Sequence, residues 1–318
     1  MEAIRRAQPP RLYVAADGPR DRPGEPRRCE EVRRIATAVD WPCDVKTLFR
    51  DQNLGLRRAV ASAIDWFFES EEEGIVLEDD CLPSLDFFRF CTELLERYRT
   101  DTRVMAICGS SYVNPGSNHT ASYYFSYYAD VWGWATWRRA WQLYDRDLTR
   151  WPEFRARRGL EVISSGRAWT ESYWTQMFDA TREGRISTWD YQWMFTVIER
   201  SGLACYPTRN LVSNIGFRAD ATNTVFDERV GHPPLVAGLP LEALPFPLNH
   251  PPVVARLPAA ESHIEALRLE LTRPAPKLVR WAKGVARRVL HEIMAPRGAD
   301  SPNADRKNNA GPGGHAGT

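Results

Sequence analysis

The chain has 318 residues, of which 43% are hydrophobic and 26% are charged, so a packed core is expected and a wholly disordered chain is excluded. Its 42 lysines and arginines almost balance its 41 acidic residues, and the net charge of +1 predicts no nucleic-acid partner. The sequence has no apolar run of about 18 residues that predicts a membrane span, and its first residues do not form a secretory signal.

The six cysteines show neither a Cys-x-x-Cys pair nor the Cys/His spacing of a metal site. Free thiols of this kind are typical of the reducing cytoplasm, where we expect the protein to be. A disulfide between Cys29 and Cys43 is the alternative interpretation.

Strands and helices are expected to alternate over the first third of the chain. This order is typical of a parallel α/β sheet, in which ligands bind beyond the carboxyl ends of the strands. The expected strands are 11–16, 45–49, 74–77 and 104–108, and the expected helices are 25–39, 53–69 and one that begins at Pro83-Ser84.

The pattern changes after Ser110, where aromatic residues become dense. Further strands or loops are expected at 123–128, 131–137 and 203–212, with helices at 138–144, 170–182 and 191–200. The predicted division is a main domain over 1–230 (halves 1–112 and 113–230), a proline-rich connector over 231–260, a helical extension over 261–294 and a disordered tail over 295–318.

Three adjacent carboxylates, Glu78, Asp79 and Asp80, follow the apolar strand at 74–77. At a buried strand end such charges are unfavourable unless a cation joins them. An all-oxygen donor set favours Mg²⁺ or Mn²⁺, which would also bind a diphosphate. A solvated turn is the alternative interpretation of the same residues.

At this motif the sequence resembles the GT-A nucleotide-sugar glycosyltransferases, in particular the N-acetylglucosaminyltransferase I type and related bacterial enzymes. The resemblance continues at Gly133-Trp134 and at Trp189-Asp190, each before an expected helix, and covers about residues 1–230. It implies a Rossmann-like, mostly parallel sheet with flanking helices, to which the C-terminal helical extension is added.

The resemblance also implies a role for each matched residue. Asp80 would bind the metal directly, while Glu78 and Asp79 would face the ribose and the metal-bound waters. Asp17, after the first visible strand, would accept a hydrogen bond from the uracil N–H, and Asp190 would be the catalytic base.

The role of Asp190 also has chemical support. An inverting transfer needs a carboxylate to take the proton of the acceptor hydroxyl, and the apolar flanks Trp189 and Tyr191 could raise the pKa of Asp190. Capping of the helix expected at 191–200 is the alternative explanation for an aspartate at this position.

Other residues are weaker candidates for the site. Trp132 and Trp134, with Trp137, could stack on the acceptor sugar, but aromatic residues more often fill cores. Arg50 and Arg57 could reach phosphate, with solvated arginines as the alternative. His250 could add a metal ligand or close over the nucleotide, with a structural role as the alternative.

The segment 277–294 combines apolar residues at helical spacing with five basic residues. It could rest on an anionic membrane surface, which would place the protein at the inner face of the membrane. A glycan, a lipid-linked molecule or a protein is the expected acceptor. Packing of this helix on the catalytic domain is the alternative.

The sequence departs from the GT-A pattern at its start. The residues before Leu12 read as the end of a helix, so the first strand of the pattern is expected to be absent and a neighbouring strand to be unpaired.

The function predicted from the sequence is transfer of a sugar, with inversion, from a nucleotide-diphosphate donor to an acceptor hydroxyl. Uridine is the expected base. Two alternatives stay open at this point: nucleotidyl transfer to a sugar phosphate, and binding of a nucleotide sugar or glycan without turnover.

Overall fold

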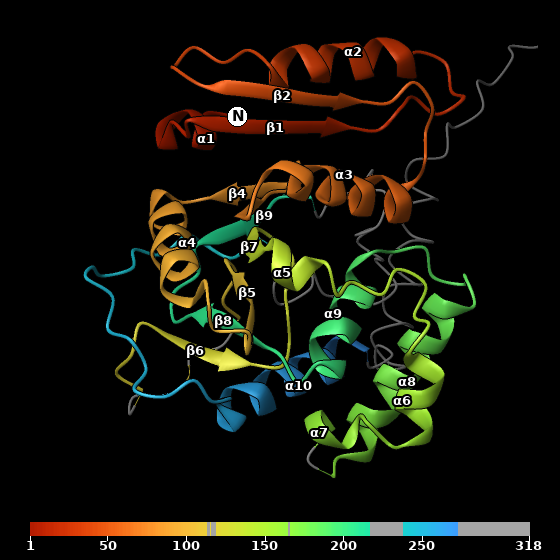
Figure 1. Cartoon of the computed structure of the whole chain (residues 1–318), viewed down its shortest axis with the longest axis vertical. Coiled ribbons are helices and arrows are strands. Elements are labelled where there is room, and N and C mark those ends of the chain that lie inside the picture. The colour runs from red at the N-terminus through yellow and green to blue at the C-terminus, as the bar shows by residue number, and fades with distance from the viewer. Residues whose placement is uncertain (113–114, 116–118, 165, 217–237, 273–318) are drawn as a thin grey trace, which may run out of the picture. The chain divides into compact units, whose positions relative to one another are not determined.

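The first two strands form a parallel pair of their own (Figure 1). Strand β1 (Arg11–Ala16) pairs with β2 (Asp44–Phe49), with Arg11 opposite Asp44 and Ala16 opposite Phe49. Helix α1 (Glu2–Ala7) precedes β1, and α2 (Glu25–Ala36) connects the two strands. In the computed structural model, residues 1–112, 115, 119–164, 166–216 and 238–272 are described.

The largest sheet has five strands in the order β3-β7-β5-β8-β6. Only β5 and β8 are parallel in this sheet, and the other three pairings are antiparallel. The chain is therefore a mixed α/β protein, and the prediction of a mostly parallel sheet is wrong. The strands are β3 (Glu73–Val76), β5 (Val104–Cys108), β6 (Tyr123–Ser126), β7 (Trp134–Trp137) and β8 (Leu203–Pro207).

Strand β7 explains why the sheet is mixed. It lies antiparallel between β3 and β5, so that Ala135 faces both Ile75 and Ile107. Local periodicity predicts that a strand forms, but it does not predict which strands will be its neighbours. The expectation of a mostly parallel sheet therefore fails at β7.

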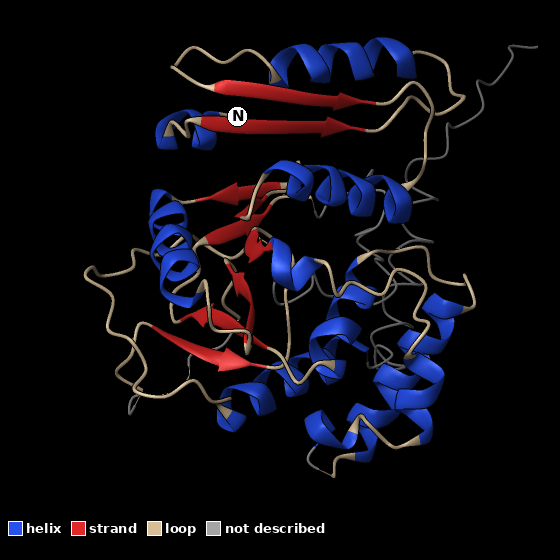
Figure 2. Cartoon of the chain, viewed as in Figure 1, coloured by secondary structure: helices blue, strands red, loops and turns tan. Residues whose placement is uncertain are grey.

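Hydrophobic residues fill both faces of the five-stranded sheet. Trp134 and Tyr124 point to a cluster that includes α3 (Leu56–Ser70), while Ala135 and Phe125 point to a cluster that includes α4 (Leu85–Tyr98). Side chains of successive strand residues point to opposite faces, and here both faces are covered by helices (Figure 2). All residues of β5, β6, β7 and β8 are buried as a result.

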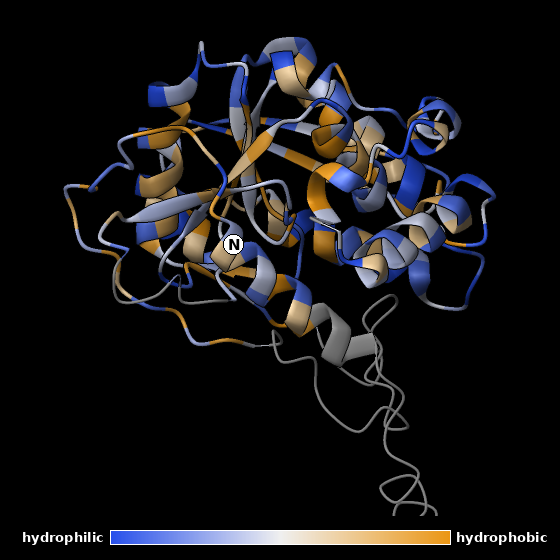
Figure 3. Cartoon of the chain, turned by 90° about the horizontal axis from the view of Figure 1, so that it is seen from below, coloured by the Kyte–Doolittle hydropathy of each residue, from blue (hydrophilic) through white to orange (hydrophobic). Residues whose placement is uncertain are grey.

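A group of helices follows β7 and has its own aromatic core, which includes Trp151, Trp174, Phe178 and Phe195. In Figure 3 the hydrophobic colour lies mainly on the inner strands and the inward sides of helices, and the outer turns are hydrophilic. The helices that contribute to this core are α6 (Trp151–Ala156), α7 (Glu161–Ser164), α8 (Ala168–Arg182) and α9 (Asp190–Glu199). Helix α5 (Arg138–Trp141) precedes them, and its Trp141 belongs to the cluster that includes α3.

The proline-rich segment returns to the main domain. Leu244 and Leu248 are buried in the cluster that covers the α4 face of the sheet. Helix α10 (Pro258–Thr272) follows and contacts β6. The described residues belong to one compact unit, formed by Met1–Glu228 and His232–Arg273.

Several boundaries differ from those expected. The helix expected at 138–144 stops at Trp141, and the strand expected at 203–212 divides into β8 and β9 (Val212–Asn214), which pairs with β4 (Cys81–Pro83). The helix start at Ser84 is confirmed, because its hydroxyl accepts a hydrogen bond from the Phe87 N–H at 3.2 Å.

All six cysteines are free, so the alternative disulfide between Cys29 and Cys43 is not formed. Within the described ranges, no helix is both long and apolar enough to cross a bilayer. The segment 277–294, expected to contact a membrane, lies outside the described residues.

The buried carboxylate of Glu261 connects α10 to β6. It accepts hydrogen bonds from the Tyr127 N–H (2.9 Å), the Ser126 hydroxyl (3.2 Å) and Arg256 Nε (2.8 Å).

We expect Glu261→Ala to lower the free energy of unfolding by about 2–4 kcal/mol, because these buried donors lose their acceptor. Urea unfolding measures the change. Glu31→Ala, which removes only an exposed ion pair on α2, is the control and should leave the free energy of unfolding almost unchanged.

Candidate functional site

The carboxylate triplet forms a turn between β3 and β4. The Cys81 N–H donates to the Glu78 carbonyl at 3.1 Å, which closes the turn. On the other side, the Ile215 N–H donates to the Asp80 carbonyl at 2.8 Å, next to the pairing of Cys81 with Asn214. Two strands that are far apart in sequence therefore hold the backbone of this turn.

Glu78 lies in the most negative surroundings of the three. Burial is the main reason that its pKa rises to about 8, and the charges of Asp80, Asp190, Asp79 and Asp130 raise it further. Asp79 is exposed, whereas Glu78 and Asp80 are partly buried. The structure thus brings Asp190, which is distant in sequence, into the electrostatic neighbourhood of the triplet.

Asp130 belongs to this group and was not identified from the sequence. It lies in the loop before β7, and β7 runs antiparallel to β3 with Trp134 opposite Val76. The residues just before Trp134 must therefore lie beside the end of β3, where Glu78 follows. The pairing of β7 with β3 is therefore the signal that would identify Asp130, and the sequence alone does not give this pairing. Its carboxylate accepts a hydrogen bond from the Tyr112 hydroxyl.

Asp190 is the first residue of α9 rather than its cap. The N-cap is Trp189, and the Asp190 carboxylate accepts a hydrogen bond from the Thr188 hydroxyl. A negative charge in the first turn of a helix is stabilised by the helix dipole. The capping alternative therefore does not describe this residue.

Asp80 is held close to the backbone of Gly216. Burial and then the charge of Asp79 raise the pKa of Asp80, and the nearby Asn214 amide and Cys81 thiol (3.7 Å) partly offset the rise. A Cβ atom added to Gly216 would lie 2.2 Å from Asp80 Oδ2. The absence of a side chain at 216 is what leaves room for this carboxylate.

The donor set suits a hard divalent cation. Carboxylate oxygens with a surplus of negative charge are the ligands that Mg²⁺ and Mn²⁺ prefer. Across the described part of the chain, no three acidic, histidine or cysteine side chains are grouped closely enough to form a metal site by themselves. Asp80 and its neighbours would therefore fit such an ion only with ligands from water or from substrate phosphates, which is the usual arrangement for Mg²⁺.

Asp17 lines the same cavity as Glu78 and Asp79, but its carboxylate already binds backbone. It accepts from the N–H groups of Gly18 (2.9 Å), Leu54 (2.9 and 3.1 Å) and Gly55 (3.0 Å). These bonds hold the loop that begins α3. The predicted contact with a base stays a prediction, and the observed role is structural.

The structure does not support a role for Arg50 in phosphate binding. Its Nη2 donates to Ser62 Oγ on α3 at 2.7 Å, and its carbonyl accepts from Arg33 at 2.6 Å. Arg57 likewise binds the Arg146 carbonyl and Asp147. Both arginines connect elements of the fold.

The two tryptophans predicted to bind the acceptor have different positions. Trp134 is fully buried, with its ring 5.4 Å from Trp193 and 5.9 Å from Trp189, so its surroundings fit the alternative of core packing. Trp132 is partly buried, and its ring makes an edge contact with Tyr112. Trp132 and Tyr112 therefore form the aromatic side of the group around Asp130, while Trp137 is buried in the core.

His250 has structural partners. Its Nδ1 lies 3.0 Å from the Tyr123 hydroxyl and its Nε2 lies 3.3 Å from Glu93. Burial lowers its pKa, which favours the neutral ring. These contacts fit the structural alternative and not a metal ligand.

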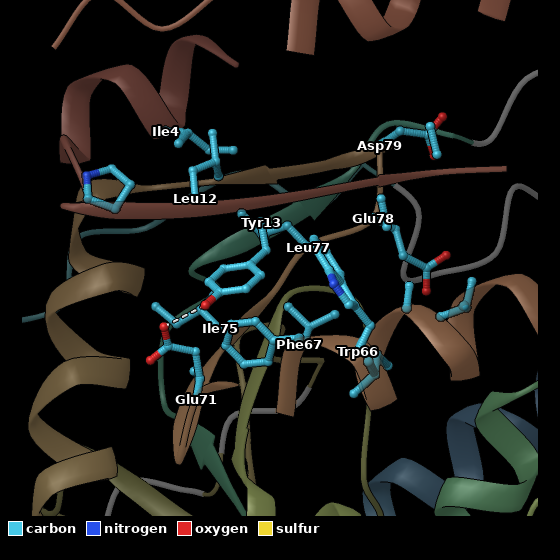
Figure 4. A pocket seen from close by; sticks show the side chains of 18 of the residues that line it. Ile4, Leu12, Tyr13, Trp66, Phe67, Glu71, Ile75, Leu77, Glu78 and Asp79 are labelled. Carbon is cyan, nitrogen blue, oxygen red and sulfur yellow. Dashed lines mark hydrogen bonds between the residues drawn. The ribbon is translucent and has the colours of Figure 1, made fainter. Parts of the chain in front are cut away.

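A cavity of about 1330 Å³ reaches the carboxylates from the side of β1 (Figure 4). Glu78 and Asp79 line one end of this cavity, and the apolar side chains of Leu12, Ile75 and Leu77 line its length. The cavity therefore offers carboxylate oxygens at that end.

Comparison with models of known protein families and with curated protein sequences gave no match for this chain. The assignment of function therefore depends on the chemistry of the site.

The raised pKa of Glu78 predicts that stability falls as pH rises. Between about pH 4.5 and pH 8 the unfolded chain has released this proton while the folded chain retains it, so folding becomes less favourable with increasing pH. We expect Glu78→Gln to remove this decline and to be more stable than wild type by about 1–4 kcal/mol at pH 8, with little difference near pH 4.5.

Urea unfolding at a series of pH values measures this difference. Glu69→Gln, at an exposed position of α3, is the control and should follow the wild-type curve. A difference between Glu78→Gln and wild type that does not change with pH would contradict the assigned pKa.

Proposed function

We propose that this protein transfers a sugar, with inversion, from a nucleotide-diphosphate donor to an acceptor hydroxyl in a metal-dependent reaction. Uridine is the proposed base of the donor. The observation that carries the proposal is the convergence of Glu78, Asp80, Asp130 and Asp190 at one strand end, where burial and then the charges of these carboxylates raise the pKa of Glu78 to about 8. Such crowding of carboxylates is typical of a functional site.

The carboxylates divide between two tasks. Asp80, with Glu78 and Asp79 beside it, would hold a Mg²⁺ or Mn²⁺ ion together with the donor phosphates. A divalent ion bound there supplies the positive charge that stabilises the departing diphosphate.

Asp190 has the role of general base. It would take the proton of the acceptor hydroxyl as that oxygen attacks the anomeric carbon, and the bond from the Thr188 hydroxyl orients its carboxylate. Its carboxylate lies in the first turn of α9. Asp190 lies on α9 and Asp80 lies in the turn before β4, so the base and the metal ligand come from different elements of the fold.

Trp132 and Tyr112 support a sugar ligand. Their rings meet at an edge contact beside Asp130, next to the carboxylate group. Aromatic faces stack on the C–H groups of sugars, and a neighbouring carboxylate can accept hydroxyl hydrogen bonds. This combination is suited to one ring of the donor or acceptor.

Binding without turnover is the second candidate function. It is favoured by one observation: the β1–β2 pair, which carries Asp17, shares no strand pairing with the sheet that carries Glu78. A nucleotide bound between the β1–β2 pair and that sheet would then not be held by one continuous sheet. Metal-dependent binding of UDP without transfer of sugar would support this candidate.

Two substitutions separate binding from chemistry. Asp80→Asn should weaken Mn²⁺-dependent binding of UDP at least tenfold, measured by calorimetry, because the direct metal ligand is lost. Asp190→Asn should bind UDP as wild type does, yet release UDP from UDP-sugars at least 100-fold more slowly, because it cannot take the proton.

The matched control is Glu153→Gln, at an exposed position of α6, which should change neither property. Full Mn²⁺-dependent binding by Asp80→Asn would refute the metal assignment. Full turnover by Asp190→Asn would assign the base to another residue.

Gly216→Ala tests whether the position of Asp80 matters. The added methyl group would collide with the Asp80 carboxylate, which can turn away without unfolding the turn. We expect at least tenfold weaker Mn²⁺-dependent binding of UDP, with a Tm within about 3 °C of wild type. Ile215→Ala, at the exposed neighbouring residue, is the control and should bind as wild type does. Unchanged binding by Gly216→Ala would show that the carboxylate does not contact the bound ligand.

A further inference from the structure

The side chain of Asn214 lies against the turn that carries Asp80. Strand β9 pairs antiparallel with β4, and its last residue, Asn214, is opposite Cys81, which directly follows Asp80. Only 2% of Asn214 is exposed. The next residue, Ile215, donates its N–H to the Asp80 carbonyl at 2.8 Å. The end of β9 therefore meets Asp80 with both its backbone and a buried amide side chain.

One hydrogen bond fixes the orientation of the Asn214 amide. Its Oδ1 accepts from the Gly216 N–H at 2.8 Å, which closes an Asx turn after β9. The NH₂ group must then lie at the opposite corner of the amide, and a carboxamide nitrogen can only donate. Asn214 is therefore poorly suited to bind a cation itself, because its oxygen already accepts a backbone hydrogen bond.

The NH₂ group of Asn214 lies beside the Asp80 carboxylate. Burial and the charge of Asp79 raise the pKa of Asp80, and the Asn214 amide is the largest of the groups that offset this rise. Nδ2 is nevertheless buried without a hydrogen bond of normal geometry to any described residue. A buried donor without an acceptor is unfavourable for folding, so stability does not explain why an amide is present here.

A second buried asparagine shows the usual arrangement of such a side chain. Asn210 is also 2% exposed, and its Oδ1 accepts from the Ser111 N–H at 3.0 Å. Its Nδ2 donates to the carbonyls of Leu239 and Pro240, each at 3.2 Å. Asn210 thus joins three segments of the chain through backbone partners. Asn214 differs, because its oxygen binds within its own turn and its nitrogen lies beside a carboxylate.

We propose that Asn214 is a positioning residue for Asp80: its Nδ2 donates to one carboxylate oxygen and leaves the other oxygen directed at a divalent cation. This inference rests on the proposed metal-binding role of Asp80. Carboxylates that ligate metals are commonly held by a hydrogen bond from a second group, and loss of that group lowers metal affinity about 10–100-fold. The Cys81 thiol, 3.7 Å from Asp80 Oδ1, is a weaker donor to the same carboxylate.

Packing of β9 against its neighbours is the competing explanation for a buried residue at this position. The same face of β9 carries Val212, which is also 2% exposed and belongs to the cluster that includes α4. Packing alone would favour an apolar residue at 214 as it does at 212, since an amide with an unpaired donor is unfavourable in a buried position. The choice of asparagine therefore supports the positioning role.

A double-mutant cycle tests the proposal. Asn214→Ser keeps a hydroxyl that can accept from the Gly216 N–H but loses the amide donor. We expect it to weaken the binding of Mn²⁺ together with inorganic pyrophosphate about tenfold, measured by calorimetry, with a Tm within about 5 °C of wild type. In an Asp80→Asn background the same substitution should change binding less than about twofold, because a neutral side chain at 80 does not ligate the ion whichever way it points.

Ser213→Ala, at the neighbouring buried position of β9, is the matched control and should bind as wild type does. Equal weakening by Asn214→Ser in both backgrounds would overturn the proposal, because Asn214 would then act independently of Asp80. Unchanged binding by Asn214→Ser in the wild-type background would overturn it as well. Asn214→Ala, measured in the same two backgrounds, gives the same decision if the serine variant does not fold.

Pyrophosphate has neither a base nor a sugar, so this test is separate from the test of the proposed function. Binding of Mn²⁺ and pyrophosphate that follows the expected cycle, without any transfer from UDP-sugars, would count against sugar transfer and leave the positioning role intact. Absence of Mn²⁺–pyrophosphate binding by wild type would overturn both.

Discussion

The pairing of β7 with both β3 and β5 is the contact on which the rest of the structure depends. Ala135 is opposite Ile75 on one side and Ile107 on the other, so one short strand joins the first half of the chain to the second. The same pairing brings the loop of Asp130 and Trp132 to the end of β3. Without it, the acidic turn after β3 would have neither its fourth carboxylate nor its aromatic neighbours.

The electrostatic interactions of the site lower the stability of the fold. Glu78 is buried among like charges, and the described residues that most strongly affect its pKa are all acidic. A protein that only needed to fold would be more stable with a neutral residue there, since buried unpaired charges are costly. Arrangements of this kind are typical of sites that meet a positively charged or proton-donating ligand. The short β4–β9 pair and Gly216 keep Asp80 in that arrangement.

Local signals in the sequence predicted the elements well, because they depend on neighbouring residues. The serine at 84 begins a helix as expected, and the apolar run at Val104–Cys108 is a buried strand. Pairing between distant segments could not be predicted, so Asp130 was missed and the sheet was expected to be parallel. The two-residue spacing of Trp132 and Trp134 is compatible with one face of a strand, but β7 begins only at Trp134. It does not show which of them is covered, since that depends on α3 and α9, which pack against Trp134.

The bond between Glu261 and Ser126 spans 135 residues of sequence, and it has a consequence for synthesis of the chain. Strand β6 is made early, but the carboxylate that accepts from its end arrives only with α10. At a translation rate of about 5–20 residues per second, β6 waits roughly 7–27 s for this partner. During that interval the aromatic side chains of β6 also lack Leu244 and Leu248. The nascent protein therefore passes through a stage in which aromatic side chains of β6 lack contacts that they make in the folded state.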